Sequence, residues 1–143
     1  MTGECLCGGV RIEIAGKVGP VVYCHCSQCR KASGTAFAAN ADVRRRYWRF
    51  VSGEDLVREY ESSPGKLRVF CGRCGSPIYA YLRAAPEYLR LRLGSLDTPF
   101  TGQPKAHTWV SDKASWAPIA DDLPQCPQWA PRSVLVQKGS RQP

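Results

Sequence analysis

Apolar and polar residues alternate along several short stretches of the chain, so that every second residue is apolar. The alternation is clearest over residues 10–14, 66–70 and 89–93. Such a period of two is typical of strands that bury one face. Residues 17–23 and 77–82 are further candidates for strands. The pattern therefore predicts an all-β protein whose strands are mainly antiparallel.

Turn-forming residues separate these stretches, at residues 52–54, 63–65, 85–86 and 98–99. Helical structure is expected only as short turns, over residues 27–33, where Gly34 would end the helix, and near residues 112–116. In the strand at residues 89–93, Arg90 and Arg92 are expected on the solvent face.

The length of 143 residues fits one domain with a real hydrophobic core. We expect that domain to span residues 1–131. The segment over residues 132–143 is mostly polar and basic and is expected to be a partly disordered tail.

Composition narrows the class of protein. A hydrophobic content of 43% is typical of a globular chain. No run of about 18 apolar residues is present, so we expect no membrane span. The first residues lack the basic and apolar regions of a signal peptide, which favours a cytoplasmic location, where thiols stay reduced. The net charge of +8 favours anionic partners without choosing among them.

Seven of the eight cysteines fall into three tight clusters. These are Cys5 and Cys7, then Cys24, Cys26 and Cys29, then Cys71 and Cys74. In a reducing compartment such spacing indicates thiolates that bind a metal ion rather than disulfides. Two closed tetrahedral zinc sites would need eight ligands. If two pairs close one site, the three remaining thiolates leave one coordination position of the second zinc open.

We assign Cys5, Cys7, Cys71 and Cys74 to a structural zinc site. Residues i and i+2 of an extended segment share one face, so Cys5 and Cys7 can reach a common ion. Cys71 and Cys74 lie on a tight turn that contains Gly75. A shared ion would join the first strand to the middle of the sheet, and such a site can contribute about 10–16 kcal/mol to folding.

We assign Cys24, Cys26 and Cys29 to a second, open zinc site. Cys29 would lie on the first turn of the short helix, where the helix dipole together with Arg30 and Lys31 favours thiolate over thiol. The sequence also permits another partition. Cys24 with Cys26, or Cys26 with Cys29, could share an ion with Cys71 and Cys74, which would leave Cys5 and Cys7 over.

Three residues compete for the fourth position of the open site. His25 lies between two ligands, so its ring is expected to point away from the ion. His107 lies in a strand-like stretch and is expected to be a half-buried histidine. Cys126 lies in a proline-flanked loop and is the main rival within the chain. The remaining possibility is a thiol from a substrate, which loses its proton near neutral pH when it coordinates zinc. Such a sulfur could attack a small aldehyde.

The cysteine clusters and their surroundings resemble the glutathione-dependent formaldehyde-activating enzyme family, whose domain also occurs in centromere protein V. The resemblance runs, in order, through residues 3–10, 23–34, 53–56, 70–77, 94–97 and 107–116. It implies a β-tent-like fold with two zinc ions per chain. Cys5, Cys7, Cys71 and Cys74 would hold the structural ion, and Cys24, Cys26 and Cys29 the catalytic one.

The resemblance further implies a carbon–sulfur lyase that forms S-hydroxymethylglutathione from glutathione and formaldehyde. This chain resembles the shorter members of the family, so the resemblance supports membership of the family more firmly than it supports this reaction. The other hypothesis is a non-catalytic zinc module that binds nucleic acid or a protein through the basic and aromatic residues 43–50. No nucleic-acid recognition motif accompanies that segment, so we favour an exposed loop followed by a strand and do not expect nucleic acid as a partner.

Overall fold

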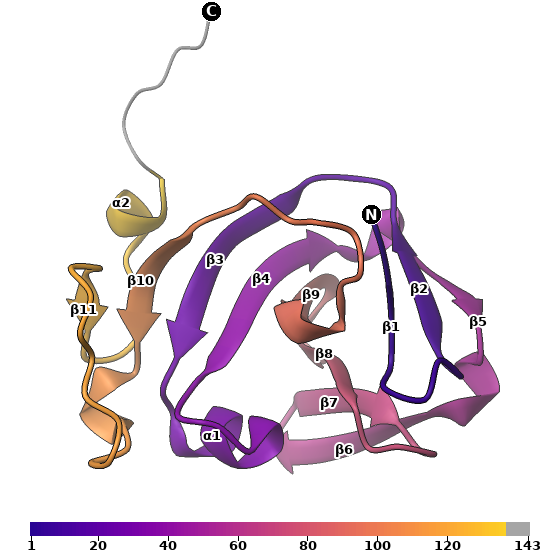
Figure 1. Ribbon diagram of the computed structural model, residues 1–143, viewed down its shortest axis with the longest axis horizontal. Helices are drawn as coiled ribbons and strands as arrows, with labels where there is room; N and C mark the ends of the chain where they lie inside the picture. The colour runs from indigo at the N-terminus through magenta and orange to yellow at the C-terminus, as the bar shows by residue number, and fades with distance from the viewer. Residues whose placement is uncertain (137–143) are drawn as a thin grey trace, which may run out of the picture. The chain divides into compact units, whose positions relative to one another are not determined.

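The computed structural model describes residues 1–136 (Figure 1). Most of the tail predicted over residues 132–143 therefore lies outside the described residues. The chain forms two compact units, one made of residues 1–19 and 40–101 and the other of residues 20–39 and 102 onward. The single domain over residues 1–131 remains a prediction. No helix among the described residues is both long and apolar enough to cross a bilayer.

The first unit consists of two sets of antiparallel strands. The three-stranded sheet has the order β1-β2-β5, and the remaining strands of this unit follow the order β4-β9-β8-β7-β6. The strands are β1 (Thr2–Glu4), β2 (Arg11–Ile14), β4 (Ala38–Arg44), β5 (Trp48–Ser52), β6 (Val57–Ser63), β7 (Lys66–Cys71), β8 (Pro77–Leu82) and β9 (Ala85–Arg92). Short 3-10 helices connect them at η1 (Arg45–Tyr47), η2 (Glu54–Leu56) and η3 (Leu93–Ser95).

The alternating residues form the core of this unit, as the sequence pattern predicts. Leu89 and Leu91 are fully buried on β9, and Ile12 and Ile14 are buried on β2. Burying such a side chain contributes about 1.5–3 kcal/mol. The all-β, mainly antiparallel prediction is confirmed for this unit.

Two sequence predictions about β9 are wrong. Arg92 was expected on the solvent face, but it is only 6% exposed and its guanidinium donates a hydrogen bond to the side-chain oxygen of Asn40 on the neighbouring strand β4. Position along a strand indicates which face a residue lies on, but not what covers that face. The turn expected at residues 85–86 lies instead at residues 83–84, so that Pro86 is within β9.

The second unit contains the strands β3 (Val18–Cys24), β10 (Pro104–Thr108) and β11 (Gln125–Cys126). Strand β10 lies between the other two and pairs with both in parallel, unlike the strands of the first unit (Figure 1). The helices are α1 (Ser27–Ser33), η4 (Val110–Asp112) and α2 (Arg132–Leu135).

The two helices predicted from the sequence have different outcomes. Helix α1 is confirmed, and Gly34 ends it in the left-handed conformation, with φ of 65°. The prediction of a helix near residues 112–116 is wrong, because only the single turn η4 forms there. That turn begins after Trp109, the one non-glycine residue with positive φ among residues 1–136. The turn ends at Lys113, whose ψ of 148° is extended and not helical.

Candidate metal-binding sites

Four cysteines meet in the first unit, although they come from two distant parts of the chain. The sulfurs of Cys5, Cys7, Cys71 and Cys74 all lie within 4.8 Å of one another. Cys5 and Cys7 are 3.5 Å apart at Sγ. A tetrahedral zinc site with bonds of about 2.3 Å places its sulfurs about 3.8 Å apart. The donor set and the spacing therefore fit a closed four-thiolate zinc site.

Backbone turns position these four thiols. The amide of Cys5 donates to the carbonyl of Val10 at 3.0 Å, and the amide of Val10 donates to Sγ of Cys5 at 3.2 Å. Cys71 ends β7, and its carbonyl accepts a hydrogen bond from Gly75, whose φ of 76° closes the turn. The two turns meet where the Leu6 amide donates to Oγ of Ser76 at 3.0 Å.

The thiols of this group differ in acidity. The Ser76 hydroxyl, 3.2 Å from Sγ of Cys74, and the Ser76 backbone amide lower the pKa of Cys74 to about 5. The amide of Gly9 lowers the pKa of Cys7. The nearby sulfurs, that of Cys5 first, raise it by more than this amount, so the pKa of Cys7 is raised overall, to about 11. A cation bound between the four sulfurs would stabilise all of them as thiolates.

Three cysteines meet in the second unit at the end of β3 and the start of α1. The sulfurs of Cys24, Cys26 and Cys29 lie within 4.8 Å of one another. Cys26 is the residue that precedes α1, and its sulfur accepts a hydrogen bond from the Cys29 amide at 3.4 Å. Cys24 and Cys29 are 4% and 8% exposed and pack with Ala38 and Trp109. These three residues are the three-thiol group.

Mutual proximity also governs the acidity of the three-thiol group. Hydrogen bonding to the sulfurs of Cys26 and Cys29, followed by burial, strongly raises the pKa of Cys24. Hydrogen bonding from Cys24 lowers the pKa of Cys26, but Cys29 and burial outweigh it and the pKa is raised overall. The raised pKa values of Cys24 and Cys26 fit a site where a metal ion supplies the compensating charge.

No fourth ligand from residues 1–136 joins the three-thiol group. Among the Cys, His, Asp and Glu side chains of that part of the chain, none places a ligand atom within 4.8 Å of all three sulfurs. Cys126 is buried on β11 as a free thiol outside both groups. Nor does the geometry join Cys71 and Cys74 to the three-thiol group; it places them with Cys5 and Cys7.

The two histidines that were weighed as ligands contact each other instead. Nε2 of His25 lies 2.8 Å from Nδ1 of His107, and Nε2 of His107 lies 3.0 Å from the carboxylate of Asp121. Burial is the main cause that lowers the pKa of His25, and the positive charges of its neighbours add to it. Sequence reasoning missed Asp121, because a carboxylate in a loop 14 residues beyond His107 carries no local signal.

The basic and aromatic segment of the first unit uses its arginines within the unit. Arg44 stacks on Tyr88 at 3.9 Å from the ring centroid, and Arg45 stacks on Tyr81 at 4.9 Å while donating to the Pro86 carbonyl at 2.7 Å. Arg46 stacks on Tyr47. These contacts favour a structural role for the segment over a nucleic-acid groove.

The fold and the two thiol groups together define a cysteine-rich β protein with the donor sets of metal sites. The family model for the glutathione-dependent formaldehyde-activating enzyme matches residues 1–112. The chain therefore belongs to this family.

Relatives and a solved structure are similar to the chain. A Halomonas elongata protein that bears the family's name is 30% identical over 135 residues, which cover 83% of this chain and 80% of that one. An uncharacterized lyase of Schizosaccharomyces pombe is 30% identical over 87 residues, covering 60% of this chain and 61% of the lyase. A crystal structure of a Rhodobacter sphaeroides protein matches with a TM-score of 0.59 and 26% identity, over 71% of this chain and 92% of that one.

Proposed function

We propose that this protein is a zinc-dependent carbon–sulfur lyase that forms S-hydroxymethylglutathione from glutathione and formaldehyde. The observation that carries the proposal is the three-thiol group without a fourth ligand from residues 1–136. The family name supports a glutathione-dependent reaction of formaldehyde. The name of the fission yeast relative supports the lyase class.

The reaction adds a thiol across a carbonyl group. A sulfur–carbon bond forms, the carbonyl π bond breaks, and the proton lost by the thiol ends on the oxygen as a hydroxyl group. No electrons are exchanged with a third reactant. A zinc ion held by Cys24, Cys26 and Cys29 would supply the acidity that turns a bound substrate thiol into a nucleophile.

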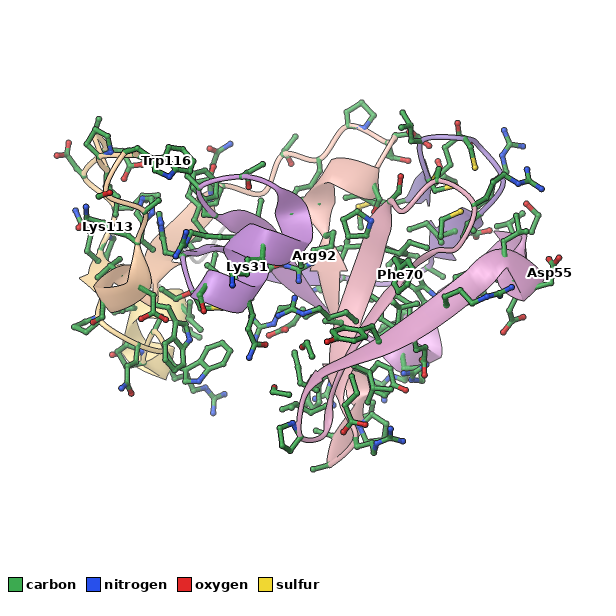
Figure 2. The ribbon with its side chains drawn as sticks, turned by 90° about the horizontal axis from the view of Figure 1, so that it is seen from below. Lys31, Asp55, Phe70, Arg92, Lys113 and Trp116 are labelled. Atoms are coloured by element: carbon green, nitrogen blue, oxygen red, sulfur yellow. The ribbon has the colours of Figure 1, made fainter. Side chains whose placement is uncertain are left out.

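Residues around the three-thiol group fit an acidic substrate. Helix α1 has no acidic residue in its first turn, while Arg30 and Lys31 lie in its last turn. Figure 2 shows Lys31 on α1 and Lys113 and Trp116 on the segment that follows β10. Glutathione carries two carboxylates, so cations on α1 and on this segment would favour its binding over that of a neutral thiol.

Burial of the thiols would protect the reaction from water. Trp109 packs against Cys24, Cys29 and Ala38, and its ring meets that of Trp129 edge to face at 5.7 Å. A dry wall strengthens electrostatic interactions with the reacting sulfur. The four-thiol group of the first unit would hold the second zinc ion and have a structural role.

Exchange spectroscopy on mixtures of glutathione and formaldehyde tests the proposal. The zinc-loaded protein should accelerate interconversion of free glutathione and its hydroxymethyl adduct, and the loaded Cys29→Ser variant should not. Cys126→Ser is the matched control, because Cys126 lies outside both thiol groups. Equal exchange rates with and without the wild-type protein would refute the proposed reaction.

A further inference from the structure

Three side chains are linked by hydrogen bonds in a row. The last of them belongs to His25, which lies in the sequence between Cys24 and Cys26 of the three-thiol group. Asp121 contacts Nε2 of His107 with both carboxylate oxygens, at 3.0 and 3.1 Å, and Nδ1 of His107 contacts Nε2 of His25 at 2.8 Å. Both histidines are 2% exposed, whereas the Asp121 side chain is 48% exposed. We call this set the Asp121–His107–His25 chain.

The direction of each hydrogen bond follows from the carboxylate. The Leu123 amide donates to Oδ1 of Asp121 at 3.0 Å, and this bond, followed by that of His107, lowers the pKa of the carboxyl group. An ionised carboxylate only accepts, so Nε2 of His107 carries the hydrogen. Nδ1 of His107 then accepts, and the hydrogen between the rings belongs to Nε2 of His25. Nδ1 of His25 is left with a lone pair.

The burial of His25 supports this assignment of the ring hydrogens. Its Nδ1 atom is buried and has no hydrogen-bond partner. A buried N–H without a partner is rarer and more costly than an unfilled acceptor. The opposite order would require a charged His107 and an N–H on that buried atom. The neutral Nε2–H form of both rings avoids both costs.

The Asp121–His107–His25 chain also bears on where the His25 ring lies. His25 is the residue between Cys24 and Cys26, and its amide donates to the Thr108 carbonyl on β10 at 2.9 Å. Its carbonyl accepts a hydrogen bond from Nε of Arg30 at 3.2 Å. The ring is hydrogen-bonded to His107, and neither of its nitrogens lies within 4.8 Å of all three sulfurs. Yet neutral imidazole is one of the commonest zinc ligands.

We propose that Asp121 and His107 are positioning residues that keep the His25 imidazole out of the coordination shell of the three-thiol group. The fourth position thereby remains available to a substrate thiol, and the inference rests on the proposed function to this extent. In this arrangement the tautomer of each ring is set by Asp121, and the place of the His25 ring is set by His107.

The tautomers can be measured without metal or substrate. The chain contains only two histidines, so long-range 15N–1H NMR correlation reports on both rings without overlap. Both should be neutral with the hydrogen on Nε2. In Asp121→Ala, the carboxylate that accepts the hydrogen bond from Nε2 of His107 is lost. The Nε2–H form of His107 is then no longer fixed, and its Nδ1–H form should become populated.

Asp122→Ala is the matched control, because it makes the same change at the adjacent exposed carboxylate. Its two imidazoles should give the wild-type spectrum. A doubly protonated His107 in the wild type, or unchanged tautomers in Asp121→Ala, would overturn the proposal.

Cobalt-substituted protein tests whether His25 is kept from the metal. In His107→Ala, His25 should become the fourth ligand, so the cobalt absorption bands should shift before any thiol is added. Glutathione should then bind on the order of tenfold more weakly, because it must displace His25 from the fourth position. Bands and affinity should return towards the wild type in the double variant His25→Ala/His107→Ala. Wild-type bands in His107→Ala, with native circular dichroism, would refute the positioning role.

Failure of this inference is distinguishable from failure of the proposed function. If the tautomers and the cobalt bands respond as described but glutathione–formaldehyde exchange is not accelerated, the positioning role stands and the reaction falls. If the wild type, His107→Ala and His25→Ala/His107→Ala all accelerate exchange equally, the proposed reaction is supported and the positioning role is refuted.

Discussion

Sγ of Cys7 lies 4.0 Å from Sγ of Cys71, and the two residues are 64 positions apart. The contact joins the turn that follows β1 to the end of β7. The folded state holds these sulfurs together, so a metal ion bound there stabilises the folded chain relative to the unfolded one. At a free zinc concentration of about 1,000 times the dissociation constant, this linkage is worth about 4 kcal/mol.

The first prediction concerns that metal. Cys71 is fully buried, and the double variant Cys71→Ser/Cys74→Ser, which leaves only two thiols, should lose one zinc ion per chain and have a melting temperature lower by roughly 10 °C. Metal analysis and a thermal melt measure both effects. Cys126→Ser should keep both ions. A Cys71→Ser/Cys74→Ser protein that still holds two zinc ions would show that this group is not a metal site.

The second prediction separates the two thiol groups. Cys29→Ser should lose the zinc of the three-thiol group, retain the other ion and remain folded. The reason is that a closed four-thiolate site is expected to stabilise structure, while an open site is expected to serve chemistry. Metal stoichiometry with and without glutathione, together with circular dichroism, provides the measurement. Complete unfolding of Cys29→Ser would mean that the structural and open sites have been assigned in reverse.

The third prediction compares two glycines with the same backbone angle. Gly53 and Gly65 both have φ of 73°. A Cβ on Gly53 would lie 2.0 Å from the carbonyl oxygen of Gly9, whereas a Cβ on Gly65 would meet no atom within 4 Å. Gly65→Ala should therefore cost only about 1 kcal/mol, from the left-handed backbone.

Gly53→Ala should cost about 2–4 kcal/mol, because the backbone must also move. Urea denaturation of the two variants measures the difference. Similar losses in both would show that the turn at Gly53 relaxes without cost.

The fourth prediction concerns pH. The Gly65 amide, followed by Arg83 at 3.2 Å, lowers the pKa of Glu61 below its ordinary value of 4.5. A depressed carboxyl pKa stabilises the fold above the ordinary value, and this stabilisation is lost as the pH falls through the folded-state pKa. Glu61→Gln should therefore have a lower urea midpoint than the wild type at pH 7.

The difference in urea midpoint between Glu61→Gln and the wild type should shrink towards zero as the pH falls below the pKa of the Glu61 carboxyl group in the folded state. Glu87→Gln, at an exposed position on β9, serves as the control and should show a smaller change at pH 7. A gap for Glu61→Gln that is constant from pH 7 to acid would contradict the role of this carboxylate.

Local rules were enough for much of the fold. The alternation at residues 10–14, 66–70 and 89–93 located parts of β2, β7 and β9, since burial of one face imposes a period of two. Helix α1 and its glycine end followed from short-range signals as well. The spacing of the cysteines identified the seven thiols that the structure brings together in two groups.

Other features depend on contacts that no local pattern encodes. The parallel pairing of β10 with β3 and β11 joins segments far apart in the chain. The burial of Arg92 depends on Asn40 of a neighbouring strand. The positive φ of Trp109 opposes its intrinsic preference and is held by surroundings that only the folded unit supplies.

By itself, the sequence determined the strand-rich class, the short helix and the seven thiols that can bind metal, because these depend on residue type and close spacing. The tertiary structure decided that four sulfurs gather in one group and three in the other, and it brought Asp121 to His107 and His107 to His25. The physical reason is that a coordination shell and a buried hydrogen-bond chain both require distances of a few ångströms between residues that the chain order leaves far apart.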